Sequence, residues 1–304
     1  TPVRKIKGKF DELSKDRKFK ESIPDWMDEI GIKELGEAIW SKEIKAQNEP
    51  AKVILRTNTI RTNKEALKQE LLKLDIHTTV LPDYPEALEL DERANVFMTD
   101  AFKNGMFEVQ DASSQMVAHM LDIQPGMRVV DTCAGAGGTL HMACLMQNKG
   151  QIIAMDLYES KLKQLKIRAK RNGIHNIEYR VIDTTKVIKK LHGQADRVLI
   201  DAPCSGLGVL KRNPDAKWKL KPEFIDNIRK VQAEVLESYA PIVKPGGKLV
   251  YATCSVLPSE NQEQIKKFLT TETGKNFTFV EDKKVLAHES GYDGFYMALL
   301  TRNN

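Results

Sequence analysis

Apolar strands that alternate regularly with helices over residues 105 to 304 are the feature that most constrains the fold of this chain. The strand candidates are MRVVDTC, QIIAMD, EYRVID, RVLIDAP and KLVYATC. Strands this apolar are typical of a parallel sheet covered by helices on both faces. The sequence therefore predicts an α/β fold with a doubly wound, Rossmann-like sheet. NFTFVEDKK and GFYMALLTR are two further strand candidates that could pair antiparallel at an edge.

The first third of the chain shows two other patterns. Residues 1–48 are rich in Lys and Glu, with an apolar residue every three or four positions, which predicts short amphipathic helices. Residues 49–104 contain a strand, a helix and two short strands, which predict a small α+β unit of the ferredoxin-like kind. Such units often bind RNA, so we expect three parts: a helical segment, an RNA-binding region and a catalytic domain over 105–304.

Composition limits the classes of protein to which the chain can belong. Of its 304 residues 41% are hydrophobic, and its net charge of +5 allows an anionic partner such as nucleic acid without requiring one. No apolar run approaches the roughly 18 residues of a membrane span, and TPVRKIKGKF lacks an apolar signal core. We therefore expect a cytoplasmic monomer that does not bind membranes.

The four cysteines form no C-x-x-C pair, and no histidine stands at ligand spacing from them. We therefore expect neither a metal site nor a disulfide scaffold. The default interpretation of each cysteine is a buried, inert small hydrophobe.

A glycine-rich turn follows the first strand of the predicted sheet, from Asp131 to Gly138. Glycines at such a turn let the backbone approach a ligand, but the spacing G-x-G-G disfavours an NAD enzyme. The next three strands end in Asp156, Asp183 and Asp201. Because ligands of open α/β sheets bind outside the carboxyl ends of the strands, these acids indicate a cofactor site. The alternative for each acid is a helix cap or a turn residue.

The strand-ending acids, together with the turn KPGGKLVY, resemble a class I S-adenosylmethionine-dependent methyltransferase. The resemblance implies that Asp156 holds the ribose, that Asp183 lies near the adenine and that Asp201 lies at the same edge of the sheet, in the cofactor site. It also implies that the glycine-rich turn approaches the methionine part of the cofactor; the turn comprises Cys133, Ala134, Gly135, Ala136, Gly137 and Gly138.

Two cysteines follow neighbouring strands in the methyltransferase sheet order: Cys204 lies in DAPCSG and Cys254 ends KLVYATC. DTCAGAGG, DAPCSG, KRNPDAKW, PGGKLVYATCS, PSENQEQI and FEVQDASSQ together resemble the RsmB/Nop/Sun family of RNA cytosine-5 methyltransferases over residues 105–300. The resemblance implies that Cys254 is the nucleophile, that Cys204 assists product release and that Asp201 acts on the base.

The implied chemistry explains this set of residues. Carbon-5 of cytosine attacks a sulfonium methyl only after a thiolate has added at carbon-6, and an acid can stabilise the charge that develops at nitrogen-3. One departure is that family members usually carry a lysine after the paired glycines, where this chain has Thr139. Its loss would weaken what that lysine does for the cofactor or an RNA phosphate.

The loop after Cys204 is the preferred RNA-binding candidate, because a target base needs phosphate contacts, a stacking ring and release from its own stack. Its candidates are Lys211, Arg212, Asn213, Lys217 and Trp218. The alternative for such cations is a solvated face. Ribosomal RNA is the first expected substrate and transfer RNA the second.

Two other functions stay open beside this one. A DNA cytosine methyltransferase would use Cys204 as its nucleophile, and an RNA-binding assembly factor would keep the cofactor pocket without catalysis. The presence of both cysteines favours the RNA enzyme.

Overall fold

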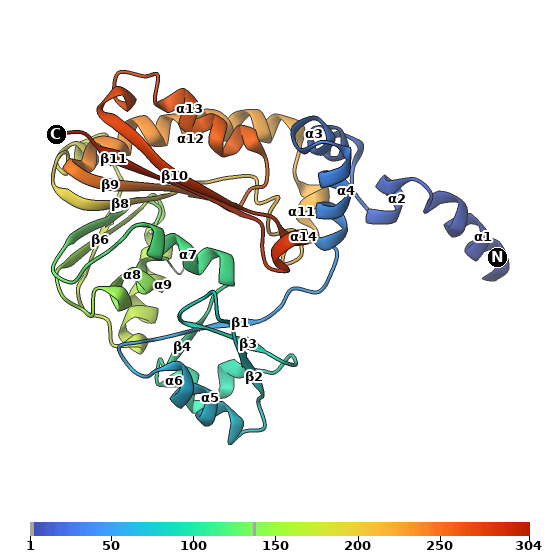
Figure 1. Ribbon diagram of the computed structural model, residues 1–304, viewed down its shortest axis with the longest axis horizontal. Coiled ribbons are helices and arrows are strands. Elements are labelled where there is room, and N and C mark those ends of the chain that lie inside the picture. The colour runs from blue at the N-terminus through green and yellow to red at the C-terminus, as the bar shows by residue number, and fades with distance from the viewer. Residues whose placement is uncertain (1–2, 136–137) are drawn as a thin grey trace.

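The computed structural model describes residues 3–135 and 138–304. Figure 1 shows a large sheet with helices on both faces, a small sheet below it, and N-terminal helices packed beside the large sheet, from which α1 projects. None of the helices in the described residues combines the length and the apolar character needed to cross a lipid bilayer.

The large sheet contains seven strands: β5 (Arg128–Asp131), β6 (Gln151–Asp156), β7 (Ile177–Val181), β8 (Ala195–Asp201), β9 (Val243–Thr253), β10 (Phe277–Val285) and β11 (Phe295–Arg302). Their order is β10-β11-β9-β8-β5-β6-β7. Strands β5 to β9 pair in parallel, whereas β11 pairs antiparallel with both β9 and β10. The predicted doubly wound sheet with an antiparallel edge is confirmed.

Helices cover both faces of this sheet. One face packs against α7 (Ala112–Met120), α8 (Gly138–Leu145) and α9 (Glu159–Asn172), and the other against α10 (Thr185–Lys189), α12 (Pro222–Tyr239) and α13 (Gln262–Phe268). Helix α12 illustrates the pattern: proline stands at its first turn, and Ile225, Ile228, Gln232 and Leu236 are buried at helical spacing.

The small domain is a four-stranded antiparallel sheet with two helices. Its elements are β1 (Ile54–Thr57), α5 (Lys64–Leu72), β2 (Thr78–Val80), β3 (Ala87–Leu90), α6 (Asp100–Lys103) and β4 (Phe107–Val109). The strand order β2-β3-β1-β4 and the βαββαβ sequence are those of the ferredoxin-like fold.

Strand β4 corrects the predicted domain boundary at residue 104, which assigned Phe107–Val109 to the catalytic domain. These residues pair with β1, with Leu55 opposite Val109. A three-residue strand has too short a pattern to reveal a partner fifty residues earlier.

Two of the N-terminal helices share a core with the catalytic domain. The four helices are α1 (Val3–Leu13), α2 (Arg17–Glu21), α3 (Asp25–Leu35) and α4 (Glu37–Ala46), and those that contribute to the shared core are α3 and α4. Trp40 and Ile44 pack in one buried cluster with Leu207, Leu210 and Val256, which belong to the loops after β8 and β9. The N-terminal helices therefore support those two loops.

Gly31 allows α3 to lie against Trp40, so we expect Gly31→Ala to destabilise the protein. A Cβ at Gly31 would lie 2.2 Å from Trp40 Cδ2, and the fully buried indole is held by its hydrogen bond to Asp28 Oδ1 at 2.8 Å. We expect the free energy of unfolding to fall by about 1–3 kcal/mol in urea denaturation. Gly8→Ala in α1 is the matched control, because nothing lies within 4 Å of its Cβ position. Equal stability of the two variants would contradict the packing argument.

Shorter helices complete the described residues: η1 (Val96–Met98), α11 (Ala216–Lys219), η2 (Ala240–Ile242), η3 (Pro258–Glu260), η4 (Gly274–Asn276) and α14 (Ala287–Ser290).

Candidate active site

Cys204 and Cys254 lie side by side at the carboxyl ends of two neighbouring parallel strands. In β8 and β9, Asp201 stands opposite Ala252, and each cysteine follows within three residues of this pair. The two Sγ atoms are 3.2 Å apart, within hydrogen-bond distance for sulfur. The structure thus brings together two thiols that are fifty residues apart in the sequence.

The two thiols are not equivalent. The hydrogen bond to Cys254 and burial raise the pKa of Cys204 well above its ordinary value. Cys204 therefore keeps its proton near neutral pH and can donate its S–H to Cys254 Sγ. An acceptor sulfur beside a protonated thiol is the better candidate for the nucleophilic form.

Asp201 supplies an acid beside the thiols. Burial, reinforced by the charge of Asp131, raises the pKa of Asp201 to about 7. Burial likewise raises the pKa of Asp131 to about 6, although Thr139 Oγ1 donates to its Oδ2 at 2.6 Å and Cys133 N to its Oδ1 at 3.3 Å. Asp131 thus fixes the start of α8, whereas Asp201 can carry a proton near neutral pH.

Glu260 joins the two cysteine-bearing loops, a role that the sequence does not predict. Its carboxylate is fully buried and accepts hydrogen bonds from Ser205 N at 2.8 Å, Ser205 Oγ at 2.5 Å and Ser255 Oγ at 2.7 Å. Gln232 Nε2 on α12 is a fourth donor at 2.9 Å. Because Ser205 and Ser255 directly follow the cysteines, Glu260 fixes the spacing of the two thiols. Its place in PSENQEQI is the signal that could have singled it out.

A close glycine contact adds a second link between the same loops. Gly208 N donates to Cys254 O at 2.9 Å, and Gly294 N donates to Gly208 O at 2.7 Å. A Cβ at Gly208 would lie 2.1 Å from Gly294 O. The backbone segments can therefore meet only where Gly208 has no side chain.

Gly135, Asp156 and Lys161 meet at the carboxyl edge between β5 and β6. A Cβ on Gly135 would lie 2.7 Å from Lys161 Cδ and 3.2 Å from Asp156 Oδ2. Asp156 Oδ1 accepts from Tyr158 N at 2.9 Å, and its Oδ2 lies 3.7 Å from Lys161 Nζ. The absence of a Cβ thus lets Lys161 reach this small polar recess at the turn. The sequence does not single out Lys161.

The remaining residues predicted to bind the cofactor do not share one cluster of contacts. Asp183 lies exposed two residues beyond β7. Burial raises the pKa of Cys133 to about 12, so its thiol is inert. Ala134 is buried, with its N–H donating to Met155 O, and Gly138 begins α8. Ala136 and Gly137 lie outside the described residues.

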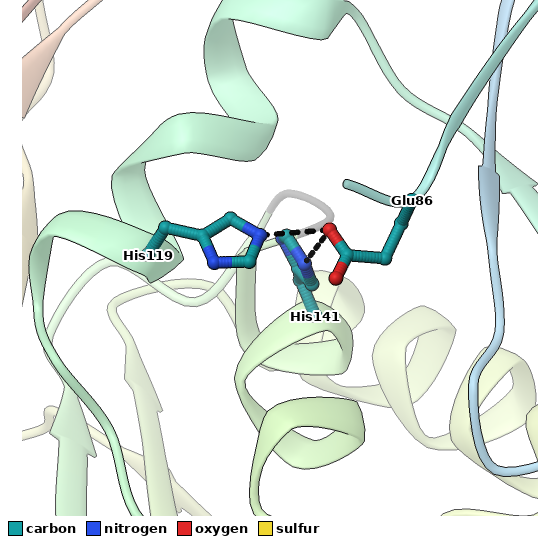
Figure 2. Close-up of side chains that lie close together, drawn as sticks. All are labelled: Glu86, His119 and His141. Carbon is teal, nitrogen blue, oxygen red and sulfur yellow. Dashed lines mark hydrogen bonds and ion pairs between the residues drawn. The ribbon is translucent and has the colours of Figure 1, made fainter. Parts of the chain in front are cut away.

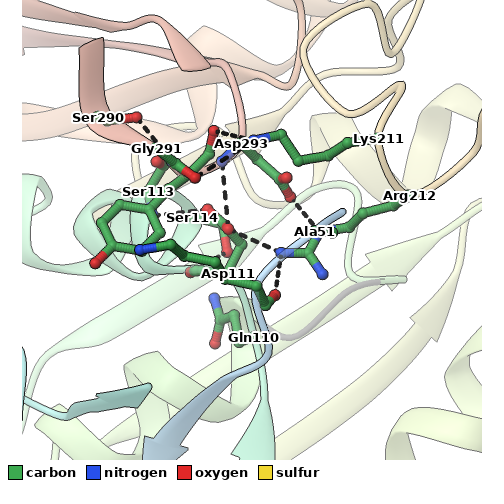
Figure 3. A network of polar contacts seen from close by, with 12 residues as sticks. Ala51, Gln110, Asp111, Ser113, Ser114, Lys211, Arg212, Ser290, Gly291 and Asp293 are labelled. Carbon is green, nitrogen blue, oxygen red and sulfur yellow. Dashed lines mark hydrogen bonds and ion pairs between the residues drawn. The ribbon is translucent and has the colours of Figure 1, made fainter. Parts of the chain in front are cut away.

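Lys211 and Arg212 tie their loop to neighbouring segments (Figure 3). Arg212 donates to Asp293 Oδ2 at 2.5 Å and to Asp111 Oδ2 at 2.9 Å, and Lys211 Nζ donates to the carbonyl oxygens of Gly291 and Tyr292. Both cations thus fix the loop after β8. Lys211 and Arg212 could contact RNA only in addition to, or in exchange for, these hydrogen bonds within the protein.

Lys217 corrects the predicted RNA-binding set. Its side chain is buried, and its ammonium donates to Glu21 O at 3.1 Å and to Asn48 Oδ1. The prediction of a phosphate contact for Lys217 is therefore wrong, because the residue anchors the N-terminal helices instead. Asn213 and Trp218 are exposed, and Trp218 borders a groove of about 590 Å³ with Phe19 among its lining residues.

Comparison with known families identifies the catalytic domain. Residues 118–301 match the family model described as 16S rRNA methyltransferase RsmB/F. The chain belongs to the RsmB/F methyltransferase family. Residues 23–97 match the ferredoxin-like domain of RsmF/B-like methyltransferases, which agrees with the topology of the small sheet.

Individual relatives of RsmB/F type cover nearly all of the chain. "Probable ribosomal RNA small subunit methyltransferase B" of Synechocystis is 35% identical in an alignment over 298 residues that covers 92% of this chain and 67% of the relative. The protein of this name, without "Probable", from Yersinia pseudotuberculosis is 34% identical over 92% of this chain and 66% of its own length. The chain thus spans about two thirds of the length of these relatives.

Solved structures share the fold of this chain. The crystal structure of PH0851 is 32% identical with a TM-score of 0.87, covering 93% of this chain and 67% of that one. NSun6 from Pyrococcus horikoshii, solved with SFG, has a TM-score of 0.84 at 20% identity, covering 93% of this chain and 99% of that one. At this identity the second likeness supports the fold alone.

Proposed function

We propose that this chain methylates carbon-5 of a cytidine in RNA, with S-adenosylmethionine as methyl donor, through a covalent adduct on Cys254. The observation that carries the proposal is the pair of thiols 3.2 Å apart beside a carboxyl group whose pKa is raised to about 7. Methyl transfer to an atom that is already nucleophilic would not need a pair of thiols. Activation of a weakly nucleophilic carbon does require a thiolate.

Cys254 would form the covalent bond. Its thiolate adds to carbon-6 of the base, and the electron pair of the carbon-5–carbon-6 double bond moves into the ring toward nitrogen-3. Cys204 keeps its own proton and donates to the neighbouring sulfur, which supports the thiolate before attack. After methyl transfer, water takes the carbon-5 proton, the electron pair of that C–H bond re-forms the carbon-5–carbon-6 double bond, and Cys254 leaves as a thiolate to which the Cys204 S–H can donate. Cys204 lies close enough to assist this step.

Asp201 would hold the base in its reactive form. A carboxyl group that is protonated near neutral pH can donate to nitrogen-3 while negative charge develops there. Its position at the end of β8, three residues before Cys204, supports this assignment. An ionised carboxylate could only accept at that place.

The recess of Gly135, Asp156 and Lys161 fits the proposed cofactor. The missing Cβ lets the Lys161 side chain approach the turn, Asp156 Oδ2 can accept from ribose hydroxyls, and Lys161 offers an ammonium. S-adenosylmethionine, when bound, supplies an electrophilic methyl group and a carboxylate that a cation can pair with. Lys161 thus lies close to the glycine-rich turn. Family members usually carry a lysine directly after that turn, where this chain has Thr139.

Ribosomal RNA is the first proposed substrate and transfer RNA the second, since the relatives are named as ribosomal RNA small subunit methyltransferases. A ribosomal substrate places the reaction in the cytoplasm. All residues invoked belong to one copy of the chain, so we propose a monomer. Asn213 and Trp218 are the exposed candidates for contacting RNA near the thiols. Mapping bisulfite-resistant cytosines with and without the protein identifies the target.

Alanine substitution of each cysteine tests the proposal. With RNA and S-adenosylmethionine, we expect Cys204→Ala to accumulate a denaturant-resistant protein–RNA adduct, because release is impaired, and Cys254→Ala to form none. Methylation should fall by at least about 100-fold in Cys254→Ala. Cys144→Ala, which removes a buried thiol outside the site, is the control.

The other outcomes are equally informative. An adduct with Cys254→Ala alone would assign the nucleophile to Cys204. If the unsubstituted protein binds RNA and gives neither methylation nor adduct, the assembly-factor function is favoured instead.

A further inference from the structure

One carboxylate and two imidazoles form a second polar cluster, between the small domain and the catalytic domain (Figure 2). Glu86 immediately precedes β3, His119 lies in the last turn of α7, and His141 lies in the first turn of α8. Their ligand-type atoms all lie within 4.8 Å of one another. Three elements that are far apart in the sequence thus direct metal-binding groups at one point.

The spacing of these groups is close to that of a coordination shell. Glu86 Oε2 lies 2.7 Å from His119 Nε2 and 3.4 Å from His141 Nε2. Donor atoms on a tetrahedral zinc ion with bonds of about 2.1 Å are about 3.4 Å apart. His119 would have to withdraw from Glu86 by less than an ångström, and its side chain is 26% exposed, which leaves it room to move. The same exposed side can admit water as a further ligand.

His141 gives an independent indication of a missing partner. It is fully buried, and within the described residues neither of its ring nitrogens makes a hydrogen bond. A buried polar group without a partner costs free energy, so such groups are rare in folded proteins. Burial also lowers the pKa of His141 to about 4, which keeps the ring in the neutral form that binds metals.

The charges around the cluster set an upper limit on its affinity. Glu86 is ionised: despite burial, the hydrogen bond from His119 and the His141 ring, whose Nε2 lies 3.4 Å from Glu86 Oε2, hold its pKa below the usual range. The buried Arg56 guanidinium on β1 also acts on His141, although its Nε donates to Gln110 Oε1 at 2.7 Å. This positive charge opposes a cation, so moderate rather than very tight binding is expected.

We propose that Glu86, His119 and His141 bind a divalent cation of the zinc type. Two imidazoles and one carboxylate are a donor set that zinc uses, and imidazole favours zinc over magnesium. The cation would tie the small domain, through Glu86, to the first turn of α8, which follows the glycine-rich turn. The wide spacing of the three residues along the chain does not predict this site from sequence.

Titration of the metal-free, full chain with Co²⁺ tests the proposal, because this ion replaces zinc and absorbs visible light. We expect one equivalent to bind with visible bands, to be displaced by Zn²⁺ and to be unaffected by Mg²⁺. A nitrogen- and oxygen-ligated ion lacks the intense near-ultraviolet bands that thiolate ligands give. Those bands would instead indicate binding at Cys204 and Cys254.

Substitutions assign the ligands. We expect His119→Ala and His141→Gln each to weaken Co²⁺ binding by at least about 100-fold, and His175→Ala, an exposed histidine elsewhere, to leave it unchanged. Zn²⁺ should raise the Tm of the unsubstituted protein and of His175→Ala, but not of His119→Ala. Because His119 is partly exposed, that variant should fold even if His141→Gln does not.

Three results would overturn the proposal: no saturable binding, binding that His119→Ala leaves intact, or binding that disappears only in Cys204→Ser. Each readout is independent of methyltransferase activity, so failure here leaves the function of the cysteine pair untouched.

Discussion

Replacing Glu260 by alanine is expected to impair both folding and catalysis, because one carboxylate holds both cysteine-bearing loops. The substitution would leave the buried Ser205 N–H without its acceptor and would remove one of the two acceptors of Gln232 Nε2, which also donates to Pro203 O. We expect the free energy of unfolding to fall by about 3–5 kcal/mol. A shift of the thiols by an ångström would lower single-turnover methylation by about 100-fold.

Glutamine at the same position should rescue much of this loss. Its carbonyl oxygen can accept from Ser205 N and Gln232 Nε2, while its NH₂ group can donate to the hydroxyls of Ser205 and Ser255, which rotate to accept. We expect Glu260→Gln to cost about 1 kcal/mol in urea denaturation and to retain adduct formation. Glu263→Ala, an exposed acid three residues along, is the matched control. A Glu260→Ala variant as active as this control would refute the positioning role.

Replacing Asp201 by asparagine is expected to stabilise the protein while abolishing its activity. Burial and Asp131 raise the pKa of Asp201 to about 7 in the folded state, against about 4 in an unfolded chain. Between these values the folded protein holds a proton that the unfolded chain has released, so stability falls as pH rises from about 4 to 7. Asparagine carries no such penalty and should raise the free energy of unfolding at pH 8 by about 1–3 kcal/mol. The gain should vanish near pH 4.

Activity should respond in the opposite direction. Without the acidic proton, methylation should fall by at least about 100-fold. Asp196→Asn, on the same strand, is a control for which we expect the opposite change in stability. Although burial opposes it, the Lys244 ammonium lowers the pKa of Asp196, so its removal should destabilise the protein at pH 8. The free energy of unfolding of both variants, measured by urea denaturation from pH 4 to pH 8, tests these two expectations. If Asp201→Asn were destabilised at pH 8, the carboxyl group would not be the strained acid inferred here.

The parallel sheet could be predicted from sequence because its strands are continuous apolar runs. The strand-to-loop transitions also placed Cys204 and Cys254 at one edge, since both follow buried strands directly. These features are local in the chain, and periodicity reports them. Partners that are distant in sequence leave no such pattern, and β4 is an example: FEV pairs with β1 but is too short to show it.

The sequence could not predict which charged side chains are buried by partners and which are exposed. Lys217 carries the same charge as its lysine neighbours, yet it is buried against Glu21 and Asn48, which lie 196 and 169 positions away in the sequence. Arg212 is likewise engaged by Asp111 and Asp293. Whether a surface charge is free for RNA depends on these tertiary partners. Glu260 shows the converse, because nothing local marks it as buried.

The core shared by the N-terminal helices and the cysteine loops has a consequence for the order in which the protein is built during synthesis. Trp40 and Ile44 leave the ribosome more than 150 residues before Leu207 and Val256, on which they pack. Until those residues follow, the apolar face of α4 is uncovered and the loop of Cys204 lacks its support. The thiol pair can therefore form only after Cys254 has been made, so a shorter nascent chain carries no assembled nucleophile.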